Sequence, residues 1–255
     1  GAALQIPSSG TFDNSVSVPS LAADGGALFA SKSDVAAAFD TATRTQRWSV
    51  VTDPLGLGNR NGGHATLYTA ASNGTLFAAR KIGLLMITGA DTLAPAATEL
   101  EPYVVYQTGK TNRWASNTSA FGEPRIAMAL SSDGGTLYLG GDRYGSVYAL
   151  DAATGAKRWS VNPSGNFADG GAPPSAPVVS ADGRLIFTQK DKLYVYNPDG
   201  TQLLSWDPNT SDSSALSSPT LVNYRGAQRV YVAGGRTLYA IELCPAPRGS
   251  LIAFF

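Results

Sequence analysis

The chain has 255 residues, of which 43% are hydrophobic and only 15% are charged, and its 19 basic residues balance its 19 acidic residues. This composition supports a substantial buried core. With no net charge, the protein has no strong positive electrostatic potential that would attract nucleic acid or an anionic membrane. No run of about 18 apolar residues occurs, so the sequence predicts no membrane span. Cys244 is the only cysteine and His64 the only histidine, which rules out an internal disulfide and disfavours a His/Cys zinc site.

Five glycine-containing turns punctuate the chain. An Asp or Asn beside a Gly, flanked by alternating apolar residues, predicts a tight β-turn because such a turn needs a positive φ angle. The turns are Asp24-Gly25, Asn73-Gly74, Asp133-Gly134, Asp182-Gly183 and the weaker Arg225-Gly226. Their recurrence is close to the length of one β-propeller blade, roughly 40–50 residues.

Short strands are predicted around each turn, in chain order. One follows the turn directly: Ala27–Ala30, Thr75–Ala79, Thr136–Leu139, Leu185–Thr188 and Val230–Ala233. The next comes after a brief polar break: Val35–Phe39, Leu84–Ile87, Ser146–Leu150, Leu193–Tyr196 and Thr237–Ile241. Another strand precedes each turn, and a last strand begins at a tryptophan or at the residue in its place. The repeating unit is therefore a sheet of four antiparallel strands. No helical period is sustained anywhere, so the fold class is all-β.

The unit occurs five times, which predicts a single β-propeller domain over residues 1–255. The approximate blades are 16–50, 65–106, 125–161, 175–206 and 218–255. Four short strands have exposed edges and one bare face, and they become stable by stacking around an axis as the blades of a propeller do. The alternative is that the chain forms part of a seven- or eight-bladed propeller.

The clearest copy of the repeat lies at residues 145–159. Its recognisable residues are Gly145, Tyr148, Ala149, Leu150, Asp151, Thr154, Gly155 and Trp159. Asp40 and Trp48 repeat the spacing from Asp151 to Trp159, and a third copy ends at Trp206. This repeat resembles that of the PQQ-like, or quinoprotein-type, β-propeller family. The resemblance implies that the Trp of one blade packs over the Gly of a neighbouring motif, and that the Asp and Thr close the turn between the third and fourth strands.

The same resemblance raises the question of a cofactor. Quinoprotein dehydrogenases of the family would imply eight blades, Ca²⁺ held by Glu, Asn and Asp, and a vicinal disulfide against the quinone. A single cysteine excludes that disulfide, and no Asp-x-Asp-x-Asp loop appears. We therefore expect no cofactor, neither PQQ nor Ca²⁺, because fold alone does not establish function.

Candidate ligand contacts lie in the connections between blades and in the turns between second and third strands, which share one end of a propeller. The connections, near 51–65, 107–124, 162–174 and 207–218, are rich in Gly, Asn, Ser and Pro, and long loops on a rigid scaffold commonly carry binding. The candidate residues are Arg60, His64, Lys81, Arg113 and Arg143. His64 can also be interpreted as a polar loop residue at the start of a first strand, and Arg143 as part of an ordinary turn between second and third strands.

Charge is also distributed unevenly between the two ends of the predicted strands. Basic residues occupy the turns between second and third strands, namely Lys32, Lys81, Arg143, Lys190 or Lys192, and Arg236. Acidic residues occupy the opposite turns, namely Asp24, Asp40, Asp91, Asp133, Asp151, Asp182 and Asp199. Either the basic end receives an anionic ligand or acidic partner, or Asp is there for turn geometry and the bases simply stay solvated.

The sequence thus predicts a non-catalytic binding or scaffolding propeller that takes another protein or a small ligand at its loop face. The alternative is an enzyme, such as a hydrolase, a lyase or a quinone-dependent oxidoreductase, that uses the central channel. Three Asn-x-Ser/Thr sequons, at Asn73, Asn117 and Asn209, permit a secreted protein. The expected location is therefore extracellular, periplasmic or at the cell surface.

Overall fold

The computed structural model describes most strands of the chain and the turns within them. The described residues are 19–22, 24–32, 35–51, 67–70, 74–80, 83–88, 96–100, 127–140, 146–163, 174–208, 215–224, 227–243 and 252–254. Every regular element in these ranges is a β-strand, as the sequence predicts. The described residues contain no helix long and apolar enough to cross a membrane.

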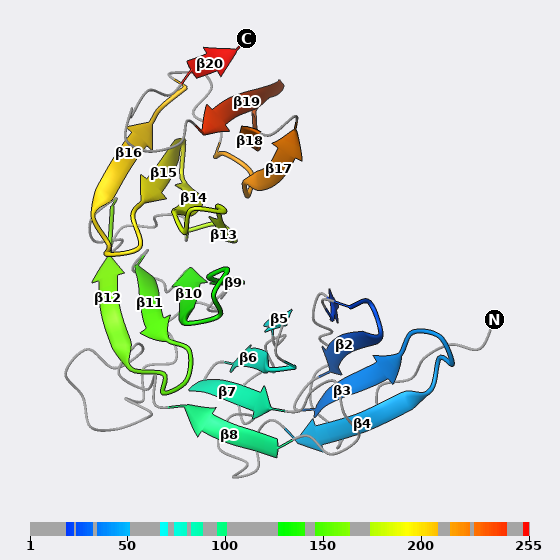
Figure 1. The fold of residues 1–255 in the computed structure, drawn as a ribbon. Coiled ribbons are helices and arrows are strands. Elements are labelled where there is room, and N and C mark those ends of the chain that lie inside the picture. The colour runs from blue at the N-terminus through cyan, green and yellow to red at the C-terminus, as the bar shows by residue number, and fades with distance from the viewer. Residues whose placement is uncertain are drawn as a thin grey trace. The chain divides into compact units, whose positions relative to one another are not determined.

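The strands form five antiparallel sheets, each made of four strands that lie side by side in chain order (Figure 1). Sheet A contains β1 (Ser20–Leu21), β2 (Ala27–Lys32), β3 (Val35–Asp40) and β4 (Gln46–Val51). Sheet B contains β5 (Leu67–Ala70), β6 (Leu76–Arg80), β7 (Gly83–Thr88) and β8 (Ala96–Leu100). Sheet C contains β9 (Ala127–Leu130), β10 (Thr136–Gly140), β11 (Val147–Asp151) and β12 (Lys157–Val161).

The last two sheets follow the same plan. Sheet D contains β13 (Val178–Val179), β14 (Leu185–Gln189), β15 (Lys192–Tyr196) and β16 (Gln202–Trp206). Sheet E contains β17 (Thr220–Tyr224), β18 (Ala227–Gly234), β19 (Thr237–Leu243) and β20 (Ile252–Phe254).

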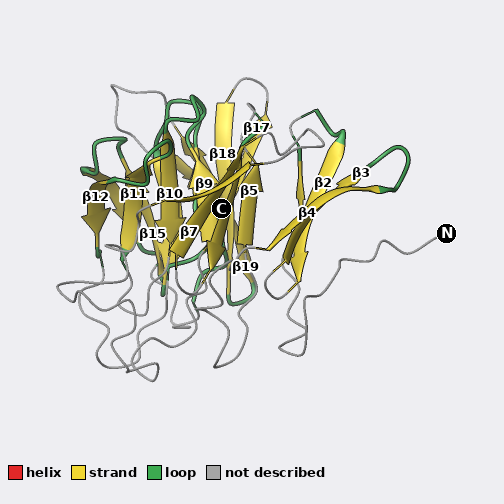
Figure 2. Ribbon diagram, turned by 90° about the horizontal axis from the view of Figure 1, so that it is seen from below, coloured by secondary structure: helices red, strands yellow, loops and turns green. Residues whose placement is uncertain are grey.

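The chain divides into two compact units, which are described separately. Unit 1 comprises Gly1–Thr118 and Ala152–Ala156 and holds sheets A and B, while unit 2 comprises Ser119–Asp151 and Lys157–Phe255 and holds sheets C, D and E. In both units we call the end that carries the first–second and third–fourth turns of a sheet the turn end. The opposite end, with the second–third turns, is the loop end. Figure 2 shows the described turns in green, joining the yellow strands.

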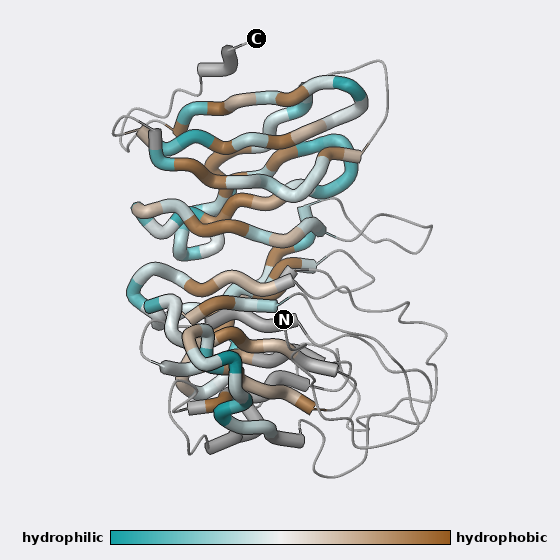
Figure 3. The backbone as a smooth tube through the Cα atoms, turned by 90° about the vertical axis from the view of Figure 1, so that its right-hand side faces the viewer, coloured by the Kyte–Doolittle hydropathy of each residue, from teal (hydrophilic) through white to brown (hydrophobic). Residues whose placement is uncertain are grey.

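Glycines at positive φ make the turns possible. Gly25, Gly134 and Gly183 have φ angles of 73°, 72° and 83° in the turns between first and second strands. An L-residue with a Cβ is disfavoured in this region, which is why the Asp-Gly pattern located these turns in the sequence. Polar residues concentrate at the turns and apolar residues along the strands (Figure 3).

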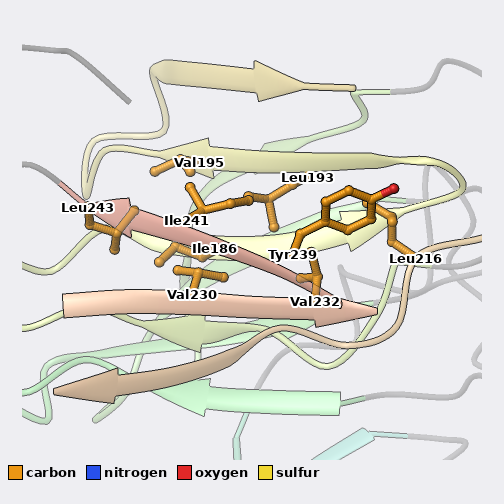
Figure 4. Packing of buried hydrophobic residues seen from close by; sticks show 9 residues of the cluster. All are labelled: Ile186, Leu193, Val195, Leu216, Val230, Val232, Tyr239, Ile241 and Leu243. Carbon is orange, nitrogen blue, oxygen red and sulfur yellow. The ribbon is translucent and has the colours of Figure 1, made fainter. Parts of the chain in front are cut away.

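Apolar side chains from adjacent sheets form the cores of the units. In unit 2, the seam between sheets D and E buries one cluster (Figure 4). Its members are Ile186, Leu193, Val195, Leu216, Val230, Val232, Tyr239, Ile241 and Leu243. The seam between sheets C and D is more aromatic and contains Tyr138, Phe187, Tyr194 and Tyr196. In unit 1, Phe29 and Trp48 of sheet A pack with Leu76 and Ile87 of sheet B.

Candidate interaction surfaces

The carboxylates of the first–second turns are engaged within their own turns. Asp24 and Asp133 accept the backbone N–H groups of Gly26 and Gly135 at 2.8 and 2.9 Å. The hydroxyl of Ser131 donates to Asp133 at 2.5 Å, and this bond, followed by the Gly135 N–H, lowers the pKa of the Asp133 carboxyl. These carboxylates therefore serve turn geometry.

The third–fourth turns use their acids in the same way. The Asp40 carboxylate accepts the N–H groups of Thr43 at 2.8 Å and Ala42 at 3.0 Å. The Thr43 bond and the Arg47 guanidinium hold the pKa of Asp40 well below its usual range. Asp199 accepts both the hydroxyl and the N–H of Thr201, which lowers its pKa. Of the two interpretations of the charge pattern, turn geometry accounts for these acids.

Sheets A and C each contain, at the turn end, an ion pair between an arginine of the fourth strand and the aspartate that ends the third strand. We call this pair the clamp. Arg47 Nη2 lies 2.7 Å from the Asp40 carboxylate and donates to the carbonyl of Gly26 at 2.9 Å. In sheet C, the side chain of Arg158 bonds Asp151 at 2.8 Å and the hydroxyl of Thr136 at 2.6 Å.

Both arginines sit where the fourth strand is bulged. The pairing register shifts between Ala38 and Phe39 in sheet A, and between Ala149 and Leu150 in sheet C. A bulge re-aims a side chain, and here it turns the arginine toward the end of the third strand and the start of the second.

Sheet D has the same bulge but a different set of side chains. The register shifts between Val195 and Tyr196, so Leu203 takes the bulged position, and 44% of its surface is exposed. Asn197 stands where sheets A and C have an aspartate, since its N–H closes the turn on Thr201 as that of Asp40 does on Thr45. The arginine of sheet D is Arg184, which lies just before the second strand, is buried, and pairs with Asp182 at 3.0 Å.

Sheet E also places its cation on the second strand. Arg229 lies 3.1 Å from Glu242, directly opposite it in the ladder, and this pairing raises the pKa of Arg229. The clamp, a bulged arginine of the fourth strand held by the aspartate that ends the third strand, is thus seen in sheets A and C. Sheets D and E instead have an ion pair whose arginine lies just before or on the second strand.

Trp159 docks sheet C onto sheet D. Its indole N–H donates to the carbonyl of Pro198 at 2.9 Å, and its ring covers Gly200, where an added Cβ would lie 2.9 Å from Cδ2 of the indole. Tyr138 packs on the same indole at a centroid distance of 5.8 Å. This is the arrangement of Trp over a neighbouring glycine that the family resemblance implies.

Of the other two tryptophans of the repeat, Trp48 has the same register position as Trp159 and Trp206 has a different one. Trp48 lies opposite Ala38, as Trp159 lies opposite Ala149. In sheet D the equivalent position belongs to Leu204, and Trp206 lies two residues further along, opposite Leu193. There it meets Tyr239 of sheet E edge-on at 5.2 Å.

The loop end of sheets D and E is linked by the connection between them. Leu216 donates its N–H to the carbonyl of Lys190 at 2.7 Å and covers Gly234, where a Cβ would meet Leu216 at 2.6 Å. Lys190 itself has a φ of 55°, close to the 57° of Gly235 in the equivalent turn of sheet E. A lysine in this conformation is strained, and such strain clusters at functional sites.

Basic residues mark this end of unit 2. Lys190 and Arg236 are exposed, and Lys192 lies 3.5 Å from Asp207. The candidate ligand contacts Arg60, His64, Lys81, Arg113 and Arg143 all fall outside the described residues and stay predictions. Within the described part of the chain, no three His, Cys, Asp or Glu side chains gather as they do around a metal ion.

Sequence reasoning overlooked the residues that distinguish sheet D. Leu203, Arg184 and Asn197 each depart from the repeat, and aligning the copies by bulge position reveals all three. Aligning them by tryptophan hides the departure, because Trp206 is not in register with Trp48 and Trp159.

Comparison with known proteins places these sheets in context. The family model described as outer membrane protein assembly factor BamB matches residues 103–244, more than half of the chain. Among curated proteins, no sequence matches the chain.

Solved structures show the same fold. BamB from Moraxella catarrhalis is 18% identical over 91% of this chain and 58% of its own, with a TM-score of 0.56. The Cps50 (Swd1) β-propeller domain of Myceliophteria thermophila is 12% identical over 94% and 72%, with a TM-score of 0.56. Hsv2 of Kluyvelomyces marxianus is 10% identical over 95% and 70%, with a TM-score of 0.59. The fold is a β-propeller of four-stranded antiparallel sheets, and the chain spans less than two thirds of the BamB structure.

Proposed function

Because the chain belongs to the family of outer membrane protein assembly factor BamB, we propose that it is a protein-binding module of a larger assembly in the periplasm, at the outer membrane. The family match carries this proposal. It covers sheets C and D and most of sheet E, so it falls mainly on unit 2. The proposed role is scaffolding and involves no catalysis and no bound cofactor.

We assign the binding role to the loop end of unit 2. At the turn end of unit 2, Asp133 and Asp199 are engaged in turn geometry. Arg158, Arg184 and Arg229 are held in ion pairs there, so these charges serve the fold. At the loop end, Lys190 is exposed and has a strained, positive φ angle, at the position that Gly235 occupies in the equivalent turn of sheet E. Arg236, the residue after Gly235, is also exposed. These two exposed cations favour a partner with an acidic segment, because complementary charge steers association.

The proposal is tested by recovering the partner from cells. The tagged full-length chain is cross-linked in its source organism, purified from the envelope fraction, and its co-purifying chains are identified by mass spectrometry. We expect a small, reproducible set of envelope proteins whose recovery falls in the double variant Lys190→Glu/Arg236→Glu.

The matched control is Lys157→Glu, which reverses a charge on an exposed lysine at the turn end. It is expected to leave recovery unchanged. Recovery of no specific envelope protein would overturn the proposed function, and equal loss in both variants would overturn its assignment to the loop end.

A further inference from the structure

The fourth strand of sheet D, β16, ends its sheet with an open edge. Sheet D runs in the order β13-β14-β15-β16, and among the described strands none pairs with the outer side of β16. An edge strand presents a row of unpaired N–H and C=O groups, which is a template for a further strand. What distinguishes one such edge from another is the chemistry that protects it.

The equivalent strands of sheets A and C are protected by charge. β4 begins Gln46-Arg47 and β12 begins Lys157-Arg158, and charged residues on an edge oppose the addition of a strand. β16 begins Gln202-Leu203, and none of its five residues, Gln202–Trp206, is charged. Among these three fourth strands, whose side chains are described, β16 is the one without this protection.

The contacts of the third–fourth turn show why β16 keeps its turn without a charged residue at the bulge. In sheets A and C the bulged arginine is held by Asp40 or Asp151. In sheet D, Asn197 takes the place of the aspartate, and its side-chain amide donates to the hydroxyl of Thr201 at 2.9 Å. The arginine of this sheet is Arg184, which pairs with Asp182 instead. The bulged position is therefore released from the clamp, and it carries the exposed Leu203.

β16 is anchored by side chains that pack into the seam between sheets D and E. Trp206 packs edge-on against Tyr239, and Leu204 packs against the buried cluster of the D–E seam. Alternate residues of β16 are thus anchored in the seam while Gln202, Leu203 and Ser205 are exposed. A fixed backbone is a better template than a fraying one, because less conformational entropy is lost on binding.

We propose that β16 accepts an extended, uncharged segment of a partner protein as a fifth strand of sheet D, with an aliphatic side chain of the segment covering Leu203. In strand addition, main-chain hydrogen bonds supply affinity and the alternating side chains supply specificity. The inference deepens the proposed protein-binding function and rests on it. It adds a second contact, on the edge of the sheet, to the basic loop end.

The test uses the full-length protein and a defined probe. The probe is a fluorescein-labelled heptapeptide, Thr-Val-Thr-Val-Thr-Val-Thr, and its binding is followed by fluorescence anisotropy. A second peptide of the same sequence carries N-methyl groups on alternate amides along the face that would pair with β16. We expect the unmodified peptide to bind and the N-methylated peptide to bind at least about tenfold more weakly, since it cannot donate to the edge.

Protein variants locate the binding. Leu203→Arg restores the charge found in β4 and β12 and is expected to weaken peptide binding about tenfold. Leu238→Arg is the matched control, because Leu238 is 68% exposed and lies on β19, an inner strand of sheet E. It is expected to bind the peptide as the unchanged protein does. Hydrogen exchange on the unchanged protein should show new protection of the β16 amides when the peptide is present.

Three results of the peptide-binding experiments would overturn the inference. These are absence of binding, equal binding of the two peptides, or equal effects of Leu203→Arg and Leu238→Arg. A concentration-dependent dimer that Leu203→Arg dissociates would also overturn it, since the edge would then pair with a second copy of this chain. In each case the envelope partners recovered by cross-linking would be unaffected, so the proposed function is judged separately.

Discussion

At the residue scale, Gly200 of sheet D lies directly against the indole ring of Trp159 from sheet C. Its φ is +86°, and an added Cβ would lie 2.9 Å from the indole of Trp159. Two separate reasons therefore require glycine here. One is the left-handed backbone conformation, and the other is the contact with the indole ring.

A pair of variants separates these two reasons. Gly134 has a φ of +72° with no atom within 4 Å of an added Cβ, so Gly134→Ala measures conformational strain alone. We expect a loss of about 1–2 kcal/mol in the free energy of unfolding for Gly134→Ala. For Gly200→Ala we expect a further loss of about 1–3 kcal/mol, because the indole must move. Urea unfolding followed by tryptophan fluorescence measures both, and equal losses would contradict the packing role of Trp159.

The lowered pKa of Asp133 leads to a prediction of how the free energy of unfolding depends on pH. The Ser131 hydroxyl and the Gly135 N–H lower its folded pKa below the unfolded value of 3.8. The stability contributed by this lowered pKa is present above the unfolded pKa and disappears as the pH falls through the folded pKa. The difference in melting temperature between the unchanged protein and Asp133→Asn should therefore shrink as the pH is lowered from 6 to 2.5. A constant difference over that range would show that the carboxylate charge makes no contribution.

At the scale of the element, the clamp shows that a bulge and its ion pair can be separated. Sheets A and C have both, while sheet D keeps the bulge and places Leu203 and Asn197 at the two positions. The bulge is therefore a property of the third–fourth turn and its register. The ion pair is an addition to it.

Transplanting the pair into sheet D tests this separation. In a double-mutant cycle, Asn197→Asp and Leu203→Arg are expected to couple favourably by about 0.3–1 kcal/mol, the usual range for exposed pairs. The coupling should weaken at 1 M salt. Thermal unfolding of the four proteins gives the number, and the cycle Asp151→Asn/Arg158→Met in sheet C serves as the reference. Zero coupling in sheet D with normal coupling in sheet C would mean that the bulges differ.

At the scale of the whole molecule, the scaffolding role makes a prediction about cofactors. We expect that addition of PQQ with Ca²⁺ leaves the near-ultraviolet and visible absorption equal to the sum of the components, and that calorimetry records no saturable heat. The physical reason is that the sole cysteine, Cys244, cannot form the disulfide that the family resemblance associates with quinone binding. A shifted absorption band that saturates at one equivalent would contradict the expectation.

Much of the fold was predictable because its determinants are local. The Asp-Gly turns require a positive φ at a known residue, and the alternating segments between them leave little freedom in strand assignment. The four-stranded sheets and the propeller fold were predicted from these features and are confirmed.

The departures in sheet D were less accessible because they depend on register. Trp206 corresponds to Trp48 and Trp159 in the sequence repeat, but the third–fourth turn of sheet D is one residue shorter, since Asn197 pairs with Thr201 where Asp40 pairs with Thr45. Trp206 also comes one residue later in the sequence, so it lies two positions further along the strand, opposite Leu193. The strain at Lys190 was equally hidden, because a lysine in a turn gives no sign of its φ angle in the sequence. The predicted loop contacts from Arg60 to Arg143 lie outside the described residues.

The hydrogen bonds that join the sheets of unit 2 also bear on the order of folding. Neighbouring strands are joined by turns of a few residues, whereas Trp159 reaches Pro198 across 39 residues and Ala181 reaches Gln228 across 47. Loop-closure entropy rises with the length of chain enclosed, so the hairpins can form early at small entropic cost, while the seams close later. Trp159 should therefore report the late step: its fluorescence should change after the bulk of the β-sheet circular dichroism has appeared.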